Sequence, residues 1–346
     1  MIKSVRFVNR FGRALCCILG EPERTNIAIT KITGLGPGTA TVNIHGIATA
    51  DGGYFGSARF DKRAIELDLR FVEWSIDGGY VPVEQTRHLS YEFFAPKTRM
   101  QMVVETDERR LLIEGYVESN DPDIFSPEES AHVTIICPGY YFKMVTDEGE
   151  KQNVSIYGNG LFVFPFSNES TTKKLLEFGT ASAIQTYTLQ YNGDMETGFD
   201  MTITFDGNQV STISIQNTPK GNSDKGPIGF ANDFEASADI YHWVDDEITY
   251  KYVQIAISDI AAKLSGRLQG HVYDSGNQIR ISSHVGKKSA YLHTLGGNKY
   301  NIVDAIHHLE WLQIYPGYNE FSVQTDNNSI GHFNVSVEYE ALYSGV

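Results

Sequence analysis

The sequence predicts a mainly antiparallel β protein, because its apolar residues recur with a period of two rather than 3.6. In residues 65–71, isoleucine, leucine and phenylalanine alternate strictly with charged side chains, as in a strand with one buried face. The same alternation recurs in residues 201–205, at Ile279 and Ile281, and in residues 333–339. The 32 glycines supply turns between such runs, most clearly at Asp51-Gly52-Gly53, Asp77-Gly78-Gly79 and Asp206-Gly207-Asn208.

Two short helices are predicted among these strands. Residues 86–95 carry a broad apolar surface, and Pro96 stops that helix. Residues 258–266 offer Ser258 as an N-cap, several helix formers, and Gly266 as a terminator. No internal repeat of fixed period accompanies these elements, so neither a propeller nor a solenoid is predicted.

The length of 346 residues suits two domains. The polar, turn-rich residues 146–152 predict a boundary that gives domains 1–148 and 149–346. Residues 217–239 are rich in glycine, proline and charge, which predicts a long surface loop. We expect this loop to open a peripheral extension of the second domain around residues 222–270.

Composition limits the classes of function. Hydrophobic residues make up 41% of the chain, which allows a sizeable core, and the net charge of −15 argues against nucleic-acid or anionic-membrane partners. Arginines interrupt the N-terminal apolar residues, so no signal peptide is expected, and no run reaches the length of a membrane span. The three cysteines, Cys16, Cys17 and Cys137, cannot all pair, which favours reduced, mostly buried thiols and synthesis in a reducing cytoplasm.

No catalytic residue, cofactor site or metal site is predicted. The late histidines, His271, His284, His293, His307 and His308, lack the spacing of a zinc site. The acidic residues at Asp121-Pro122-Asp123 and Asp245-Asp246-Glu247 could pair as general acid and base, but solvated turn residues are the favoured interpretation, with Pro122 fixing a turn. Nucleophile-elbow, P-loop and dinucleotide-binding motifs are absent from the sequence.

A run of motifs resembles one protein family. Within residues 110–142, the strand start Gly115-Tyr116-Val117-Glu118 is followed by Cys137-Pro138-Gly139 and three aromatics. This unit resembles the N-terminal module of the distal tail (Dit-like) proteins of long-tailed, siphovirus-like bacteriophages. Further similar motifs follow in the family's order, namely Ile32-Thr33-Gly34-Leu35-Gly36-Pro37-Gly38, Arg63-Ala64-Ile65, Asn192-Gly193-Asp194, Thr197-Gly198, Ile279-Arg280-Ile281, Trp311-Leu312-Gln313 and Pro316-Gly317-Tyr318-Asn319.

The resemblance implies an N-terminal, ring-forming β module with a short helix and a C-terminal galectin-like β-sandwich. It implies a structural protein of the virion tail tip or baseplate rather than an enzyme. The implied partners are further copies of this chain in a homohexamer, the tail tube protein, a tail hub protein and a receptor-binding protein. The segment around residues 222–270 looks longer than the family's usual connection.

Two sets of residues are candidate contact sites. On the strand at residues 65–71, the outward-facing Glu66, Asp68 and Arg70 are free for a neighbouring copy, so they form the candidate ring interface. The aromatics of the extension could contact a partner or could equally be the core of a hairpin; they are Tyr241, Trp243, Tyr250 and Tyr252. Two other functions compete, a carbohydrate-binding module for host cell-wall glycans and a glycan-degrading enzyme, and the latter lacks a convincing acid/base pair.

Overall fold

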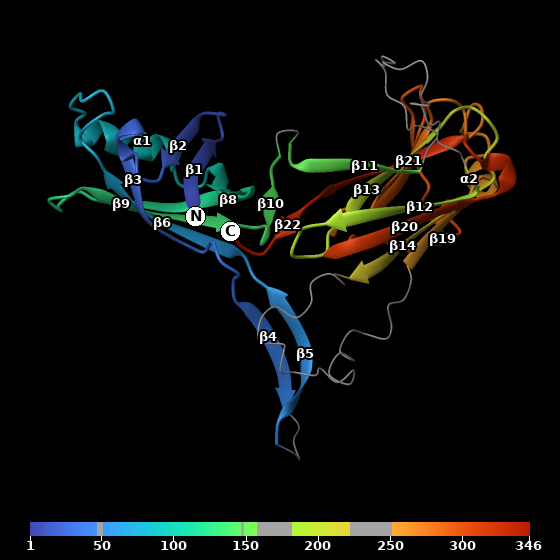
Figure 1. Cartoon of the computed structure of the whole chain (residues 1–346), viewed down its shortest axis with the longest axis horizontal. Coiled ribbons are helices and arrows are strands. Elements are labelled where there is room, and N and C mark those ends of the chain that lie inside the picture. The colour runs from blue at the N-terminus through green and yellow to red at the C-terminus, as the bar shows by residue number, and fades with distance from the viewer. Residues whose placement is uncertain (47–50, 147–148, 158–181, 222–250) are drawn as a thin grey trace, which may run out of the picture. The chain divides into compact units, whose positions relative to one another are not determined.

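The computed structural model describes residues 1–46, 51–146, 149–157, 182–221 and 251–346 (Figure 1). The chain divides into two compact units, which we treat separately. Unit 1 consists of Met1–Glu150 together with Leu342–Val346, and unit 2 consists of Lys151–Ala341. The predicted fold class, mainly β with a short N-terminal helix and a C-terminal β-sandwich, is confirmed.

Unit 1 is built on one antiparallel sheet of nine strands. Seven of them follow the order β2-β1-β7-β8-β9-β6-β3, and the short strands β10 and β22 pair at its side, β10 with both β8 and β22. The strands are β1 (Ile2–Asn9), β2 (Ala14–Ile18), β3 (Ile27–Thr33), β6 (Arg63–Phe71), β7 (Arg99–Thr106), β8 (Arg110–Asp123), β9 (Ser130–Cys137), β10 (Phe142–Met144) and β22 (Leu342–Tyr343). A 3-10 turn, Pro22–Arg24, lies between β2 and β3.

Helix α1 (Val83–Phe93) closes the core of unit 1. It begins three residues earlier than predicted, because Pro82 forms the N-cap and the chain turns helical directly after it. At its other end, the ring of Phe94 packs edge-on against Phe7 of β1, with centroids 5.1 Å apart. Both rings are fully buried, so the turn after the helix is fixed to the sheet through aromatic packing.

The predicted turn at Asp121-Pro122-Asp123 is wrong. Strand β8 continues through Asp123 and pairs with β9, with Pro122 opposite Ala131. A register shift between Val117 and Ser119 marks an irregularity in this pairing. Both aspartates are nevertheless exposed, as expected for solvated side chains.

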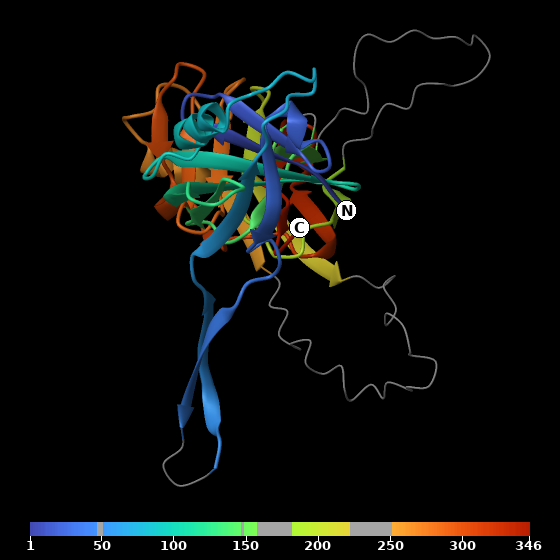
Figure 2. The same ribbon diagram turned by 90° about the vertical axis from the view of Figure 1, so that its left-hand side faces the viewer.

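A separate two-stranded hairpin belongs to unit 1 but not to its sheet. It consists of β4 (Ala40–Gly46) and β5 (Gly53–Phe60), paired antiparallel from Ala40–Phe60 to Gly46–Gly53. Figure 2 shows it running away from the nine-stranded sheet. Apart from Ala40, every residue of both strands is exposed, so both faces of the hairpin are open to solvent along most of its length.

Unit 2 is a sandwich of two antiparallel sheets. The six-stranded sheet has the order β11-β21-β13-β16-β17-β18, and the five-stranded sheet has the order β12-β20-β14-β15-β19. The first contains β11 (Lys151–Tyr157), β13 (Phe199–Phe205), β16 (Gln278–Ser282), β17 (Ser289–His293), β18 (Lys299–Asn301) and β21 (Phe333–Glu340). The second contains β12 (Ile184–Tyr191), β14 (Thr212–Gly221), β15 (Lys251–Ala256), β19 (His308–Leu309) and β20 (Gly317–Thr325). Helix α2 (Ile257–Lys263) and the 3-10 turns Val303–Ala305 and Asn327–Ser329 complete it.

The two sheets share one apolar core. The predicted alternation of β13 and β21 is confirmed, since Met201, Ile203, Val335 and Val337 are buried and their neighbours are not. Across the core, Phe199 of β13 meets Phe321 of β20 edge-on, with ring centroids 5.8 Å apart. This arrangement of six and five strands agrees with the sandwich implied by the family resemblance.

The predicted extension around residues 222–270 extends too far along the chain. Residues 222–250 lie outside the described residues, but β15 is an internal strand of the five-stranded sheet, between β14 and β19. Val253 and Ile255 of β15, and Ile257 and Ile260 of α2, are core residues. Helix α2 also starts earlier than predicted, because Ala256 rather than Ser258 is its N-cap.

The predicted division at residue 148 also needs a correction at the C-terminus. After β21 the chain returns to unit 1, where Phe142 and Lys143 of β10 pair with Tyr343 and Leu342 of β22. The last residues therefore complete the first unit, so unit 2 is inserted within unit 1 along the sequence. Among the described residues, neither helix is long and apolar enough to cross a membrane.

A pair of deletions tests the corrected extension. Replacing residues 222–250 with a flexible linker that joins Gly221 to Lys251 should leave the thermal unfolding of unit 2 nearly unchanged, since β14 and β15 already pair antiparallel. Removing residues 222–270 should abolish cooperative unfolding of unit 2, because each large aliphatic side chain lost from the core costs about 2 kcal/mol. Calorimetry and circular dichroism measure both. Equal behaviour of the two deletions would contradict the assignment of β15 and α2 to the core.

The cysteines differ in exposure, which predicts different labelling rates. All three are free; Cys17 and Cys137 are buried, whereas Cys16 is half-buried on the other face of β2. Burial raises the pKa of both buried thiols to about 11, so their thiolates are scarce at neutral pH. With a disulfide reagent at neutral pH we expect one thiol, Cys16, to react first and two to react slowly. Fast labelling of Cys137 would contradict its burial.

Candidate assembly surfaces

The centre of unit 1 is a buried arginine. Arg63 starts β6 and, at 4% exposure, shares the inward face of that strand with Ile65 and Leu67. Its guanidinium donates hydrogen bonds to four backbone carbonyls: Nε to Tyr140 at 2.8 Å, Nη1 to Gly34 at 2.5 Å and Gly36 at 2.8 Å, and Nη2 to Ser344 at 2.7 Å. Three chain segments that are far apart in the sequence are therefore hydrogen-bonded to one side chain.

The environment of Arg63 explains how the cation is tolerated. Burial lowers the pKa of its guanidinium, but arginine remains protonated at neutral pH. The guanidinium lies over the rings of Tyr140 and Phe142, with 4.5 Å and 4.8 Å to the two centroids. The four carbonyls and two aromatic faces replace the water that burial removes. Hydrogen bonds to a buried charge offset the free-energy cost of its desolvation.

At two glycines of the family-like motifs the neighbouring strands leave no room for a side chain. A Cβ on Gly34 would lie 2.1 Å from the carbonyl oxygen of Ala64, and its φ of +81° is one that other residues rarely adopt. A Cβ on Gly115 would lie 2.6 Å from Ile135 and 2.9 Å from the sulfur of Cys137. The motifs thus mark places where strands and turns of unit 1 pack at their closest.

The base of the β4–β5 hairpin rests on this centre. Phe60, the last residue of β5, stacks on Tyr140 with ring centroids 4.1 Å apart and 17° between the planes. The Tyr140 hydroxyl accepts a hydrogen bond from the backbone N–H of Gly38, just before β4. Arg63 in turn binds the carbonyl of Tyr140. The buried arginine therefore fixes the point at which the hairpin leaves the sheet.

The hairpin itself presents apolar side chains to solvent. Ile44 and Phe55, directly opposite one another, are 68% and 66% exposed. Val42, Tyr54 and Phe60 are exposed as well. An isolated two-stranded hairpin is at best marginally stable in water. Exposed apolar patches of this kind are typical of surfaces that another protein chain covers.

A groove on unit 1 offers a second apolar surface. Its volume is about 310 Å³, and it is bordered by β7, β8 and the turn before β10. Leu112, Tyr116, Pro138 and Tyr141 contribute apolar area to it. Charged side chains stand at its edge, where Arg99 binds Glu114 at 2.5 Å. Residues of the family-like motif of 110–142 therefore line this groove.

The candidate ring-interface residues face outward, as predicted. Glu66 and Arg70 of β6 are exposed, and Asp68 is half-buried. Each has a partner within unit 1: Glu66 accepts a hydrogen bond from Thr33 at 3.2 Å, Asp68 pairs with His132 at 2.7 Å, and Arg70 lies 3.5 Å from Glu128. Their contact with another copy stays a prediction.

The aromatic candidates are mostly beyond the described part of the chain. Tyr241, Trp243 and Tyr250 lie outside the described residues. Tyr252 lies on β15, where it is partly exposed and stacks on His308 with ring centroids 3.8 Å apart. Tyr252 is therefore part of the sandwich surface, not of a separate extension.

The histidines and carboxylates do not converge on a metal site in the described ranges. There, no group of three histidine, cysteine, aspartate or glutamate side chains is placed to hold a metal ion. His271, His284 and His308 each lie near a single carboxylate, of Asp274, Asp200 and Glu310 respectively.

This architecture is similar to that of a protein of known structure. The chain has the fold of a hub protein from a bacteriophage adsorption apparatus. It aligns with the crystal structure of the Dit protein (gp 19.1) of phage SPP1, a paradigm of the hub adsorption apparatus in phages that infect Gram-positive hosts, with 98% of each chain covered, a TM-score of 0.54 and 9% sequence identity. The fold-level part of the family resemblance is thereby confirmed.

Other comparisons are weaker. Two structures of the activated phage P2 baseplate, with Ca and with Sr, align at TM-scores of 0.35 and at 10% and 9% identity, with 98% and 97% of both chains covered. No protein-family model matches this sequence, and no curated protein matches it.

The role of Arg63 was not predicted from the sequence, where this residue stands only within a family-like motif. The signal that could have shown this role is the period of two, because Arg63 is in phase with the buried positions Ile65, Leu67 and Leu69 and therefore lies on the inward face. A charged residue on that face is costly unless its donors are satisfied.

Substitution of Arg63 tests its role. Arg63→Met keeps a long apolar stem but leaves four carbonyl oxygens without their donor, which should destabilise unit 1 by about 3 kcal/mol or more. The matched control on the same strand is Arg70→Met, which removes only an exposed ion pair and should change stability by less than about 1 kcal/mol. Urea unfolding measures both. Equal midpoints for the two variants would contradict the role of Arg63.

Proposed function

We propose that this chain is a structural protein of the tail tip of a long-tailed bacteriophage or a prophage-derived particle. In this role it forms a hexameric ring that joins the tail tube to the host-adsorption apparatus. The observation that carries the proposal is the solvent-exposed apolar hairpin β4–β5, which needs a covering chain. The fold shared with the SPP1 Dit protein and the order of the sequence motifs support it.

A ring requires a heterologous interface, in which one surface of each copy meets a different surface of the next. Unit 1 offers two such different surfaces, namely the hairpin and the groove beside Tyr116. The outward face of β6, with Glu66, Asp68 and Arg70, would contribute the polar rim that such interfaces have. Repetition of this contact from one copy to the next can then close a ring, and no surface needs to bind its own equivalent on another copy.

Unit 2 would project toward further components. The segment of residues 222–250 joins two neighbouring strands of the five-stranded sheet, β14 and β15, so it can be long without disturbing their pairing. We assign to it contact with a receptor-binding or hub protein through Tyr241, Trp243 and Tyr250. The protein would be made in the bacterial host cytoplasm and would act as a scaffold rather than as an enzyme.

Substitutions in the hairpin test the ring. The double variant Ile44→Ser/Phe55→Ser should prevent ring formation while leaving the melting temperature of the single chain within a few degrees, because both side chains are already exposed. Native mass spectrometry and electron microscopy of the purified wild type should show hexamers or their precursors. Tyr116→Ser, in the groove, should weaken the same assembly.

The control is Val285→Ser in unit 2, which removes an apolar side chain that is 82% exposed and should leave the ring intact. If the hairpin variant assembles as well as the wild type, the hairpin is not the contact. If the wild type is monomeric at high concentration and absent from rings in assembled particles, the proposed function is wrong.

A further inference from the structure

The outward face of the six-stranded sheet of unit 2 carries an unusual set of side chains. On β16 and β17 the apolar residues Ile279, Ile281, Ala290 and Leu292 point into the core, so their neighbours must face outward. The outward basic residues are Arg280 on β16, His293 on β17 and Lys299 on β18.

The strand register brings these three residues together. Gln278 lies opposite His293, which lies opposite Lys299 on the next strand. Two residues along β16 from Gln278, on the same face, Arg280 lies opposite Tyr291. Since directly opposed side chains on a sheet have Cβ atoms about 5 Å apart and diagonal ones about 7 Å, the three basic groups border one small area.

None of the three has a carboxylate partner among the residues that the structure describes. Arg280 donates from Nε and Nη2 to the side-chain oxygen of Gln278, at 3.0 Å and 2.7 Å, and keeps further donors. The Lys299 ammonium lies 3.8 Å from the ring centroid of Tyr291. Desolvation, followed by repulsion from Arg280 and Lys299, lowers the pKa of His293.

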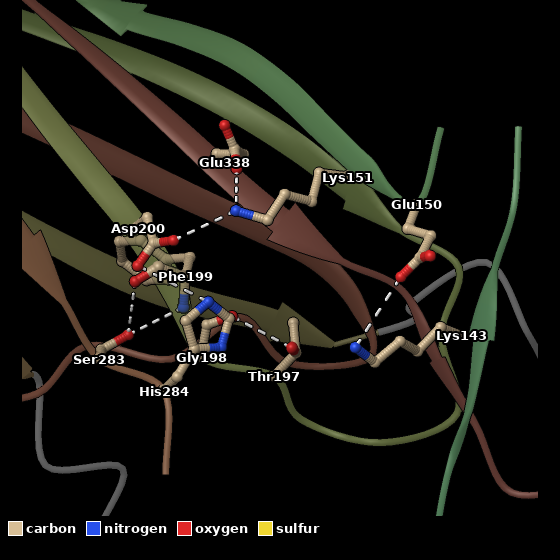
Figure 3. Close-up of polar contacts among 10 residues, drawn as sticks. All are labelled: Lys143, Glu150, Lys151, Thr197, Gly198, Phe199, Asp200, Ser283, His284 and Glu338. Atoms are coloured by element: carbon tan, nitrogen blue, oxygen red, sulfur yellow. Dashed lines mark hydrogen bonds and ion pairs between the residues drawn. The ribbon is translucent and has the colours of Figure 1, made fainter. Parts of the chain in front are cut away.

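The carboxylates on the same face are partly neutralised by one ammonium. Figure 3 shows Lys151 reaching both Asp200, at 3.5 Å, and Glu338. Asp200 lies in addition 3.8 Å from His284. One groove, with a volume of about 360 Å³, is lined by Lys151, Asp200 and Glu338 together with the three basic residues. Small polar side chains also line it, namely Asn153, Thr202, Ser282, Ser289 and Ser336.

The charge of this groove is opposite to that of the chain. Lys151, Arg280 and Lys299 carry three positive charges against the two negative charges of Asp200 and Glu338, which leaves +1 with His293 neutral. The whole chain carries −15. An excess of unpaired cations in a concave, hydroxyl-lined site of an acidic protein is the arrangement that binds an oxyanion.

We propose that this groove binds a phosphate group, held by Arg280, His293 and Lys299. Three donors that approach from three strands suit a tetrahedral anion with several acceptor oxygens better than a planar carboxylate with two. The group could be free phosphate or the phosphate of a sugar ester, whose ring would extend along the groove toward the serine and threonine hydroxyls. The site belongs to the sandwich itself and does not depend on ring formation.

Calorimetric titration of the full chain with inorganic phosphate, glucose 6-phosphate and glucose tests the site. We expect both phosphates to bind and glucose not to bind. Tighter binding of glucose 6-phosphate would assign the site to phosphorylated saccharides, and equal or weaker binding would assign it to the free anion. Absence of binding by both phosphates would overturn the proposal.

Variants locate the binding. Arg280→Gln and Lys299→Gln alter exposed side chains and should each weaken phosphate binding by roughly tenfold or more, the effect of one charge-assisted hydrogen bond. Lys287→Gln is the matched control, since it changes the net charge equally from the exposed loop between β16 and β17. An equal effect of all three substitutions would show only long-range charge attraction and would overturn the assigned site.

The pH dependence gives a second readout. Sulfate keeps its charge near neutrality, whereas phosphate does not, so sulfate is the probe. Arg280 of β16 and Lys299 of β18 are the charged groups that face His293, and a bound dianion offsets both, favouring the imidazolium. Sulfate affinity should therefore rise as pH falls from about 7.5 to about 6, through the ordinary histidine pKa of about 6.5. His293→Gln should abolish this rise; a rise that persists would exclude His293.

Discussion

The Arg63 guanidinium is the interaction on which the architecture of unit 1 depends. It binds carbonyls of the turn before the hairpin, of the aromatic segment after β9 and of the C-terminal residues, and all four bonds are within the chain. A neutral apolar residue could fill this volume but could not satisfy carbonyls that the fold turns inward. The buried charge thus specifies which segments meet, at the cost of desolvation that its hydrogen bonds offset.

The base of the hairpin rests on that centre. Phe60 stacks on Tyr140, whose backbone carbonyl Arg63 binds, so the base of the ribbon is rigidly placed while its strands face solvent. A rigid base and an apolar, uncovered ribbon are what a clasp between identical subunits needs, because preorganisation reduces the entropy lost on association. The fold shared with a phage hub protein gives this surface its proposed place in a ring.

In the six-stranded sheet of unit 2, alternation along each strand places apolar side chains on one face and charged side chains on the other. One face of the six-stranded sheet packs against the five-stranded sheet through Ile279, Ile281 and Leu292. On the opposite face Lys151 pairs with two carboxylates (Figure 3). The basic group around His293 lies on the same face and has no carboxylate partner among the described residues. The same period of two that builds the core therefore also gathers the proposed phosphate ligands.

The sequence by itself determined the β class, the two-part organisation and the outward position of Glu66, Asp68 and Arg70, because alternation along a strand is a local property. It also placed both helices to within a few residues. Only the tertiary structure showed that β15 is a core strand, that β22 returns to unit 1, and that Arg63, Tyr140 and Ser344 meet. These depend on pairings between residues tens to hundreds of positions apart, which no local pattern encodes.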